Sequence, residues 1–349
     1  MSIGPLSTLA MRETMRTQLL RTQQSFDQTT REVASGRHHD VGLVLGSSTS
    51  RAINARQMVS DIDSILDSNT LTNSRLSTAQ SALSAAVEIA NDFFETVVSI
   101  RQSGADRGLM VADARNMLGT MSTLLSATSN GAYVFGGANA GKPPFADYVN
   151  DPAQTARTAV TGAFTAEFGF GPDDPQAGQI TAAQMQGYLG GSYAALFEDP
   201  AWGTSFSSAS DGGIELRIAP HEVATSSFNA NDKGIRMLVS TLVAAVDAGA
   251  SQLDAETFDV FASTLAQNVS AAASEITRMQ SRIGLLQERV TEASERMSLG
   301  RGMFERTIGS LENVDIGQAS VRLNELATQL DTSYAVTARV QRLSILNYL

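Results

Sequence analysis

Apolar residues recur at alternating spacings of three and four residues over two unusually long stretches of the chain. The first stretch runs from Val59 to Val97 and the second from Leu265 to Leu311. An average spacing of 3.5 residues is the period of a coiled-coil seam. At a rise of roughly 1.5 Å per residue, the two stretches predict helices about 60 and 70 Å long. The chain is therefore expected to contain two long helices that pack on one another as a rod.

The large apolar residues of these two seams are the expected core of the rod. They are Val59, Ile62, Leu66, Leu76, Leu83, Val87 and Phe94 on the first seam, and Ile276, Met279, Ile283, Leu286 and Val290 on the second. Asn69, Asn73 and Gln80 interrupt the first seam, and polar seam residues fix register at a cost in stability. Replacing Asn69 and Asn73 by Leu is therefore expected to raise the melting temperature of the free chain and to impair its assembly.

The character of the sequence changes between residues 136 and 231. This segment holds most of the prolines and many of the glycines and aromatic residues. Residues 214–218 alternate as Ile-Glu-Leu-Arg-Ile, which is typical of a half-buried strand, and they are bounded by a Gly-Gly pair and Pro220. The predicted fold class is mainly α: a coiled-coil-like rod formed by N- and C-terminal arms, with an inserted small β-rich domain. A loosely ordered insertion is the alternative.

The two ends of the chain carry fewer large apolar residues at helical spacing than the rod does. These residues are Leu6, Leu9, Leu19, Phe26 and Val33 near the N-terminus, and Leu323, Leu326, Leu330, Val340 and Leu343 near the C-terminus. Burying so few side chains does not offset the conformational entropy lost when about thirty residues become helical. The ends are therefore expected to order only when neighbouring copies add contacts, so these residues form the predicted assembly interface.

Composition excludes several classes of function. The formal net charge is −11 and the basic residues do not cluster, which argues against nucleic acid as a partner. The chain has no cysteine, so disulfides and thiolate sites are excluded. The first residues lack the basic and apolar regions of a Sec-type signal peptide, and no apolar run of about 18 residues predicts insertion into a membrane.

No constellation of residues predicts a catalytic, cofactor or metal site. Residues 136–143 match the spacing of a phosphate-binding loop through Lys142, but Pro143 stands where Ser or Thr would bind magnesium. His38, His39 and Asp40 are adjacent in the chain and read as a solvated loop, because neighbouring side chains point to opposite sides.

The other candidates for chemistry are equally isolated. Asp173 and Asp174 lie between two prolines and predict a surface turn. His221 has no second histidine nearby, and no Gly-x-Ser-x-Gly sequence occurs. An enzyme is not expected.

Residues 131–139 read Gly-Ala-Tyr-Val-Phe-Gly-Gly-Ala-Asn and are followed by Lys-Pro-Pro-Phe at 142–145, residues 227–232 read Ser-Phe-Asn-Ala-Asn-Asp, and residues 342–349 read Arg-Leu-Ser-Ile-Leu-Asn-Tyr-Leu. These segments resemble the flagellin family, and within it the hook-associated protein 3 branch, which joins hook to filament. The first resembles the stretch after that branch's first rod helices and the second the return from its outer domain. The third resembles the family's C-terminal helix, and its last four residues fit the junction branch. The chain departs from the family after Arg37. It reads His-His-Asp-Val-Gly-Leu-Val-Leu-Gly at 38–46, where the family has a turn rich in asparagine and aspartate.

The resemblance implies a secreted, extracellular structural subunit of the bacterial flagellum, exported unfolded by the type III apparatus. Its implied partners are further copies in a ring, the neighbouring hook-associated protein and flagellin, and an export chaperone. The implied domains are a terminal helical domain, the rod and an outer domain. Their expected bounds are residues 1–40 plus 315–349, 41–135 plus 232–314, and 136–231.

Two other functions remain open from the sequence. The chain could be a flagellin that forms the filament itself. Alternatively, the outer domain could bind a surface glycan or a host surface through exposed aromatic residues such as Tyr188, Tyr193 and Trp202. Aromatic residues of a small domain more often form its core.

Overall fold

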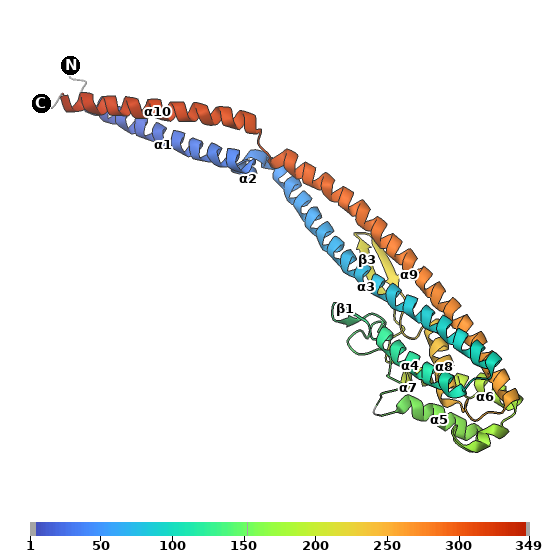
Figure 1. The fold of residues 1–349 in the computed structure, drawn as a ribbon. Coiled ribbons are helices and arrows are strands. Elements are labelled where there is room, and N and C mark those ends of the chain that lie inside the picture. The colour runs from blue at the N-terminus through green and yellow to red at the C-terminus, as the bar shows by residue number, and fades with distance from the viewer. Residues whose placement is uncertain (1–4, 152, 347–349) are drawn as a thin grey trace. The chain divides into compact units, whose positions relative to one another are not determined.

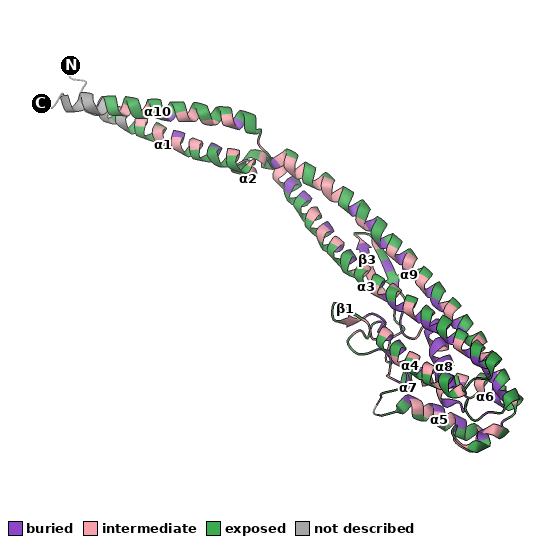
Figure 2. Cartoon of the chain, in the orientation of Figure 1, coloured by how far each residue is buried: buried purple, intermediate pink, exposed green. Residues whose placement is uncertain are grey.

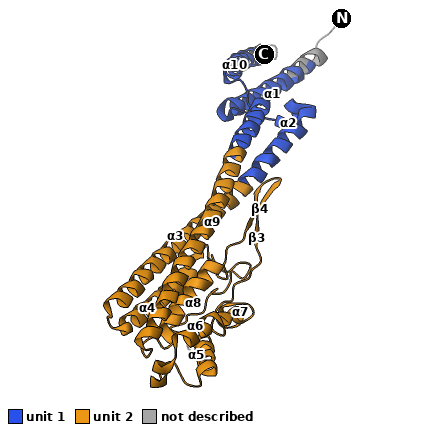
Figure 3. Ribbon diagram, turned by 90° about the vertical axis from the view of Figure 1, so that its right-hand side faces the viewer, with its two compact units in different colours: residues 1–63, 298–349 blue, residues 64–297 orange. Residues whose placement is uncertain are grey.

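The chain divides into two compact units in the computed structural model, which describes residues 5–151 and 153–346. Unit 1 comprises residues 1–63 and 298–349, and unit 2 comprises residues 64–297 (Figure 3). The side chains of residues 5–9, 11, 12 and 340–346 lie outside the description. Two long helices, α3 (Thr49–Ser103) and α9 (Ala255–Glu312), contribute residues to both units.

Unit 1 contains the two terminal helices, which lie side by side (Figure 1). These are α1 (Pro5–Ser35) and α10 (Ile316–Leu346), and we call them the terminal helix pair. Between α1 and α3 lie the short helix α2 (Val41–Leu45) and the 3-10 turn η1 (Gly46–Ser48). Asp315 caps the start of α10, because its Oδ1 accepts hydrogen bonds from the amides of Gly317 and Gln318 at 2.8 and 3.2 Å.

Unit 2 contains residues 64–103 of α3 and residues 255–297 of α9, and shorter elements pack against these two helices. The helices are α4 (Arg107–Leu125), α5 (Thr155–Phe168), α6 (Ala182–Gly190), α7 (Ala201–Ser205) and α8 (Lys233–Asp247). The 3-10 turns are η2 (Pro175–Gln179) and η3 (Ala194–Phe197), and the strands are β1 (Thr128–Ser129), β2 (Ala132–Tyr133), β3 (Ile214–Ala219) and β4 (Glu222–Ser226). One continuous apolar core joins α3, α4, α8, α9 and the segment between α4 and α8 (Figure 2).

Within unit 2, α3 and α9 run antiparallel. Residues that advance along α3 bond to residues that recede along α9: Asn69 to Ser294, Gln80 to the carbonyl of Gln280, and Arg101 to Asp259. The second seam follows the predicted pattern, since Ile276, Met279, Ile283, Leu286 and Val290 are all at most 8% exposed.

The first seam differs by one residue at four positions, where the buried residues are Ile65, Ala79, Ala86 and Phe93 rather than Leu66, Gln80, Val87 and Phe94. Ile62, Leu76 and Leu83 are buried, whereas Val59, Leu66 and Val87 are half-buried. The prediction that Phe94 lies in the core is wrong, because Phe94 is 40% exposed and Phe93 is fully buried in its place. The buried stripe continues through Ile65, Ala79, Ala86, Phe93 and Ile100. This spacing still alternates between three and four, and α3 also contacts α4, where Thr96 bonds to Asp113 at 2.9 Å. Near Phe93 the buried face of α3 is therefore shared between α9 and α4.

The structure is mainly α, as the sequence predicts, and its strands form two-stranded antiparallel sheets within the described residues. The β1–β2 turn places Asn130 and Gly131 at φ of 51° and 79°, the positive values that a type I′ hairpin turn requires. The β3–β4 hairpin lies in the inserted segment, together with α5, α6 and α7. These short helices were not expected from the sequence, because none carries a long apolar period. The predicted domain bounds remain a prediction, since the compact units do not use them.

Candidate assembly surface

The terminal helix pair buries little apolar surface of its own. Among its described side chains, the buried ones are Thr22 and Thr29 on α1 and Ala319 and Leu330 on α10. The cross-helix hydrogen bond from Gln23 to the hydroxyl of Tyr334 is exposed to solvent. A helix pair with so few buried side chains gains little of the hydrophobic stabilisation that offsets the entropy of ordering.

The predicted interface residues are mostly half-buried in the single chain. Leu19, Phe26, Val33, Leu323 and Leu326 are of intermediate exposure, and Leu330 is 8% exposed. The side chains of Leu6, Leu9, Val340 and Leu343 lie outside the described residues. Contact between copies through these residues stays a prediction.

Exposed large apolar side chains gather in unit 1, although it is the smaller unit. Most of those in the described part of the chain belong to it. They are Leu20, Leu43, Val44, Ile53, Met58, Leu299, Met303, Ile316, Val321, Tyr334 and Val336. A concentration of exposed large apolar side chains is typical of a protein that makes contacts with others.

Main-chain hydrogen bonds join the two chain segments that flank the terminal helix pair. The amide of His38 donates to the carbonyl of Glu312 at 2.9 Å, and the amide of Val314 donates to the carbonyl of Gly36 at 3.0 Å. Arg37 and Asn313 thereby form an antiparallel bridge. We call this bridge and the Glu312 carboxylate the clasp.

The Glu312 carboxylate holds the clasp through ion pairs. The side chain is 1% exposed, and its Oε2 lies 2.5 Å from Arg56 and 3.8 Å from Arg37. Arg56 belongs to α3 and Arg37 to the segment after α1, so one buried carboxylate connects three parts of unit 1. A buried carboxylate is stable only with such partners.

Directly after the clasp, α2 presents two apolar side chains to solvent. Leu43 is 82% exposed and Val44 is 53% exposed, and we call this pair the apolar knob. Asp40 caps the helix, since its carboxylate accepts a hydrogen bond from the amide of Leu43 at 2.9 Å. The main-chain amides of His38 and His39 support the same turn, since they donate to the Glu312 carbonyl and the Glu32 carboxylate.

The part of unit 2 between α4 and α8, which we call the outer segment, packs its aromatic residues together as its own core. Tyr188 and Trp202 are fully buried and Tyr193 is 4% exposed, so the alternative that these rings form an exposed glycan-binding surface is wrong, and they belong to the core. Phe164 and Phe168 pack on Tyr188 with ring centroids 5.5 and 5.3 Å away. Both contacts are edge-to-face, and such contacts between rings pack this segment without a long helical seam.

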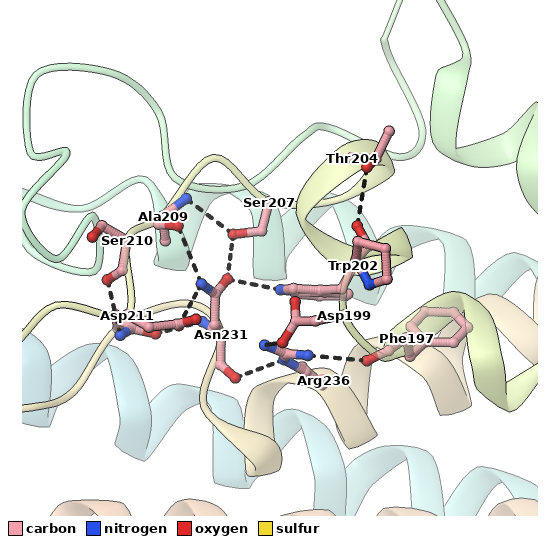
Figure 4. A network of polar contacts seen from close by, with 12 residues as sticks. Phe197, Asp199, Trp202, Thr204, Ser207, Ala209, Ser210, Asp211, Asn231 and Arg236 are labelled. Carbon is pink, nitrogen blue, oxygen red and sulfur yellow. Dashed lines mark hydrogen bonds and ion pairs between the residues drawn. The ribbon is translucent and has the colours of Figure 1, made fainter.

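A polar network centred on Asn231 closes the outer segment near its return to α8 (Figure 4). The Oδ1 of Asn231 accepts hydrogen bonds from Trp202 at 2.8 Å and Ser207 at 2.6 Å. Arg236 donates to the Asn231 carbonyl at 2.7 Å and to Asp199 at 2.9 Å. Arg236 also borders a pocket of about 390 Å³, but its guanidinium already has these partners.

A second polar cluster lies deeper in unit 2. The hydroxyl of Tyr148 donates to Asp247 at 2.7 Å, and Arg157 pairs with the same carboxylate at 3.0 Å. Burial, followed by the charge of Asp247, raises the pKa of the Tyr148 phenol. Burial likewise raises the pKa of Tyr188 and of Tyr193. The Tyr193 hydroxyl donates to the Ser240 carbonyl at 2.6 Å, whereas the buried Tyr188 hydroxyl has no hydrogen-bond partner among the described residues.

The glycine-rich loop at residues 136–143 is a turn into the outer segment. Gly137 has φ of 60°, and a Cβ atom there would lie 2.1 Å from the carbonyl oxygen of Ser210. The amide of Ser210 donates to the carbonyl of Gly136 at 3.1 Å. The loop therefore packs against its own chain, and Lys142 is exposed beside it.

The remaining candidate residues lie apart from one another. Asp174 caps η2 by accepting the Gln176 amide at 2.8 Å, and Asp173 is exposed. His221 lies in the turn between β3 and β4. In residues 5–151 and 153–346, no group of His, Asp and Glu has the arrangement of a metal site. None of the helices described there is apolar and long enough to cross a membrane.

Terminal helices that pair but bury little, joined to a helical rod with its own core, place the chain among helical structural proteins. Two family models match it: the bacterial flagellin N-terminal helical region over residues 6–140, and the bacterial flagellin C-terminal helical region over residues 266–349. Together they cover more than half of the sequence, and the chain belongs to the flagellin family.

The comparison with solved structures agrees on the fold. The chain is similar to a structure described as a flagellar hook-associated protein from Vibrio parahaemolyticus, with a TM-score of 0.52 and 8% sequence identity. The match covers 76% of this chain and 97% of the other. No curated protein sequence matches the chain.

Family membership defines the coarse function. Flagellins are structural proteins, and the family consists of self-polymerising subunits of the extracellular flagellum. The chain is therefore a structural subunit of the bacterial flagellum.

Proposed function

We propose that this chain is the junction subunit that joins the flagellar hook to the filament. Its terminal helical domain, residues 1–40 and 315–349, becomes stable when further copies form a ring around it. The observation that supports assembly is the distribution of apolar surface: unit 1 exposes large apolar side chains and buries few of its own. The segments at 131–145 and 346–349, which resemble the junction branch, favour the junction over the filament.

The weak stability of the terminal helices also suits export of the subunit to the growing flagellum. A chain with weakly stabilised ends unfolds easily for type III export and does not polymerise early. The hook-associated protein and flagellin on either side are its proposed neighbours, and an export chaperone would hold the C-terminal segment before export. The outer domain, residues 136–231, would then be a spacer with its own core.

A deletion strain tests the junction role. Cells that lack this chain are expected to build finished hooks without filaments and to lose flagellin into the medium. Restoring the gene is the control, and it should return filaments to the same hooks.

The amount of the chain in purified flagella separates the junction from the filament. A junction subunit is a trace component of sheared material, whereas a filament subunit dominates it. Filaments composed mainly of this chain would refute the junction proposal and leave the family assignment intact.

A further inference from the structure

The turn between β1 and β2 contains the only Asn-Gly dipeptide in the sequence, Asn130-Gly131. Both residues are exposed to solvent, and no atom lies within 4 Å of the position that a Cβ of Gly131 would occupy. Within the described part of the chain, no hydrogen bond holds the Asn130 side chain or the Gly131 amide. The Asn130 carboxamide is therefore free beside an unblocked main-chain nitrogen.

This pair of groups can react with itself. The main-chain nitrogen of Gly131 attacks Cγ of Asn130, a five-membered succinimide forms, and the side-chain nitrogen leaves as ammonia. Water then opens the ring at either carbonyl and gives aspartate or isoaspartate, so one water is consumed and one ammonia is released. Glycine has no Cβ to hinder the attack, and it accepts the change of backbone angles that ring closure requires.

A second dipeptide of related chemistry is held by the fold. Asp211-Gly212 is the only Asp-Gly in the sequence, and its carboxyl group can close the same ring with loss of water. The Gly212 amide donates to the hydroxyl of Ser210 at 3.2 Å, and Oδ1 of Asp211 accepts a hydrogen bond from the side-chain amide of Asn231 at 2.7 Å. The structure thus restrains the reacting groups at residue 211 and leaves those at residue 130 free.

We propose that Asn130 is a site of spontaneous deamidation in the folded chain and that isoaspartate forms there. Isoaspartate routes the main chain through Cβ, which lengthens the turn by one atom. The pairing of Ser129 with Ala132 requires a turn of two residues, so the hairpin loses its register. Water does not reverse the loss of ammonia, so the altered fraction rises with the age of the subunit.

The hairpin connects the start of the outer segment to α3. The amide of Tyr133 donates to the carbonyl of Ala140, and the amide of Val134 donates to the carbonyl of Ala127, both at 2.9 Å. Arg75 of α3 donates to the Val134 carbonyl, also at 2.9 Å. Deamidation therefore loosens the entry into the outer segment. This inference is independent of the proposed junction role.

Peptide mapping of the full-length chain after several weeks in mildly alkaline buffer tests the site. Conversion of Asn130 to acid should exceed that of any other asparagine roughly tenfold, because glycine follows no other asparagine. Enzymatic methylation of isoaspartate identifies the product. The Asn130→Gly chain is the matched control, since glycine suits the same turn, and it should remain unmodified at this position.

A parallel incubation in denaturant separates the fold from the sequence. The unfolded chain should form isoaspartate at residues 130 and 211, whereas the folded chain should form it at residue 130 alone. Equal conversion at both positions in the folded chain, or conversion of Asn130 only after unfolding, would overturn the proposal.

Hydrogen exchange measures the consequence for the hairpin. The amides of Tyr133 and Val134 should lose protection in the aged chain and retain it in a fresh Asn130→Asp chain, whose main chain has its ordinary length. Unchanged protection in chains that carry isoaspartate at residue 130 would refute the predicted loss of register.

Discussion

Gly137 determines how closely the start of the outer segment approaches the segment around Ser210. Its φ of 60° lies in the left-handed region, which costs an L-residue with a side chain roughly 1–2 kcal/mol. The neighbouring atom is a main-chain oxygen 2.1 Å from the position of a Cβ, so it cannot rotate away as a side chain would. The pair Gly136-Gly137 is thus a packing requirement.

Gly137→Ala should therefore destabilise unit 2 by about 2 kcal/mol or more, from the backbone strain together with the clash. Chemical unfolding followed by the fluorescence of Trp202, which lies in the same segment, measures the change. Gly141→Ala is the matched control, because nothing lies within 4 Å of its Cβ position. Equal stability of the two variants would contradict the close approach.

The buried tyrosines make the stability of unit 2 depend on alkaline pH. Burial raises the pKa of Tyr148, Tyr188 and Tyr193 above the value of about 10 for an unfolded chain. Above this pH the unfolded state releases protons that the folded state retains, so the free energy of unfolding falls as pH rises. The stabilisation is complete below pH of about 10 and is lost progressively above it.

A titration of tyrosinate absorbance should therefore show a steep step that coincides with loss of near-ultraviolet circular dichroism. Tyr148→Phe should reduce the amplitude of that step, since one of the three buried phenols is removed. Ionisation of all tyrosines without any loss of tertiary signal would show that the phenols are not buried.

At the scale of elements, the α3–α9 seam shows what sequence spacing can and cannot predict. The period of the two helices and every chosen core position of α9 could be read from apolar residues alone. On α3 the choice between Phe93 and Phe94 depended on α4, a neighbour that the spacing does not reveal. Short helices such as α5 and α6 pack through aromatic contacts between distant residues and carry no periodic signal.

The polar seam residues divide into two kinds once their partners are known. The side-chain amide of Asn69 donates to the carbonyl of Ile218 and to the hydroxyl of Ser294, both at 3.0 Å. Ile218 lies at an irregularity in the β3–β4 pairing, which directs its carbonyl away from the hairpin ladder. The buried Oδ1 of Asn73 has no hydrogen-bond partner within the described residues.

The joint expectation for Asn69 and Asn73 is therefore replaced by two opposite ones. Asn69→Leu should lower the stability of unit 2 by about 1–3 kcal/mol, because it leaves a buried carbonyl without its donor. Asn73→Leu should be neutral or stabilising, because it removes an unpaired polar atom. Thermal unfolding of both variants checks the signs, and a shared sign would mean that the seam acts through apolar content alone.

At the scale of the whole chain, burial is distributed unevenly between the two units. The continuous core lies in unit 2, whereas the described part of unit 1 has the clasp and a few scattered buried side chains. The scarcity of apolar residues near the termini could be read from the sequence. The clasp could not, because its main-chain bonds and the Glu312 ion pairs join residues that lie far apart in the chain.

Limited proteolysis of the free chain should therefore remove the ends, to about residue 40 and back from about residue 310, and leave a resistant middle. Mass spectrometry of the fragments identifies the cleavage sites, and assembled material is the control because its ends should survive. Ends that resist digestion in the dilute free chain would contradict the assembly argument.

The antiparallel bridge between Arg37 and Asn313 also determines the register between α1 and α10. Because that bridge pairs backbone with backbone, it sets which residue of α1 stands opposite which residue of α10 before any other copy arrives. Inserting one residue between Ser35 and Arg37 would rotate α1 by about 100° and advance it by about 1.5 Å. Leu19, Phe26 and Val33 would then face a different direction, so the length of this connection is constrained more tightly than its side chains.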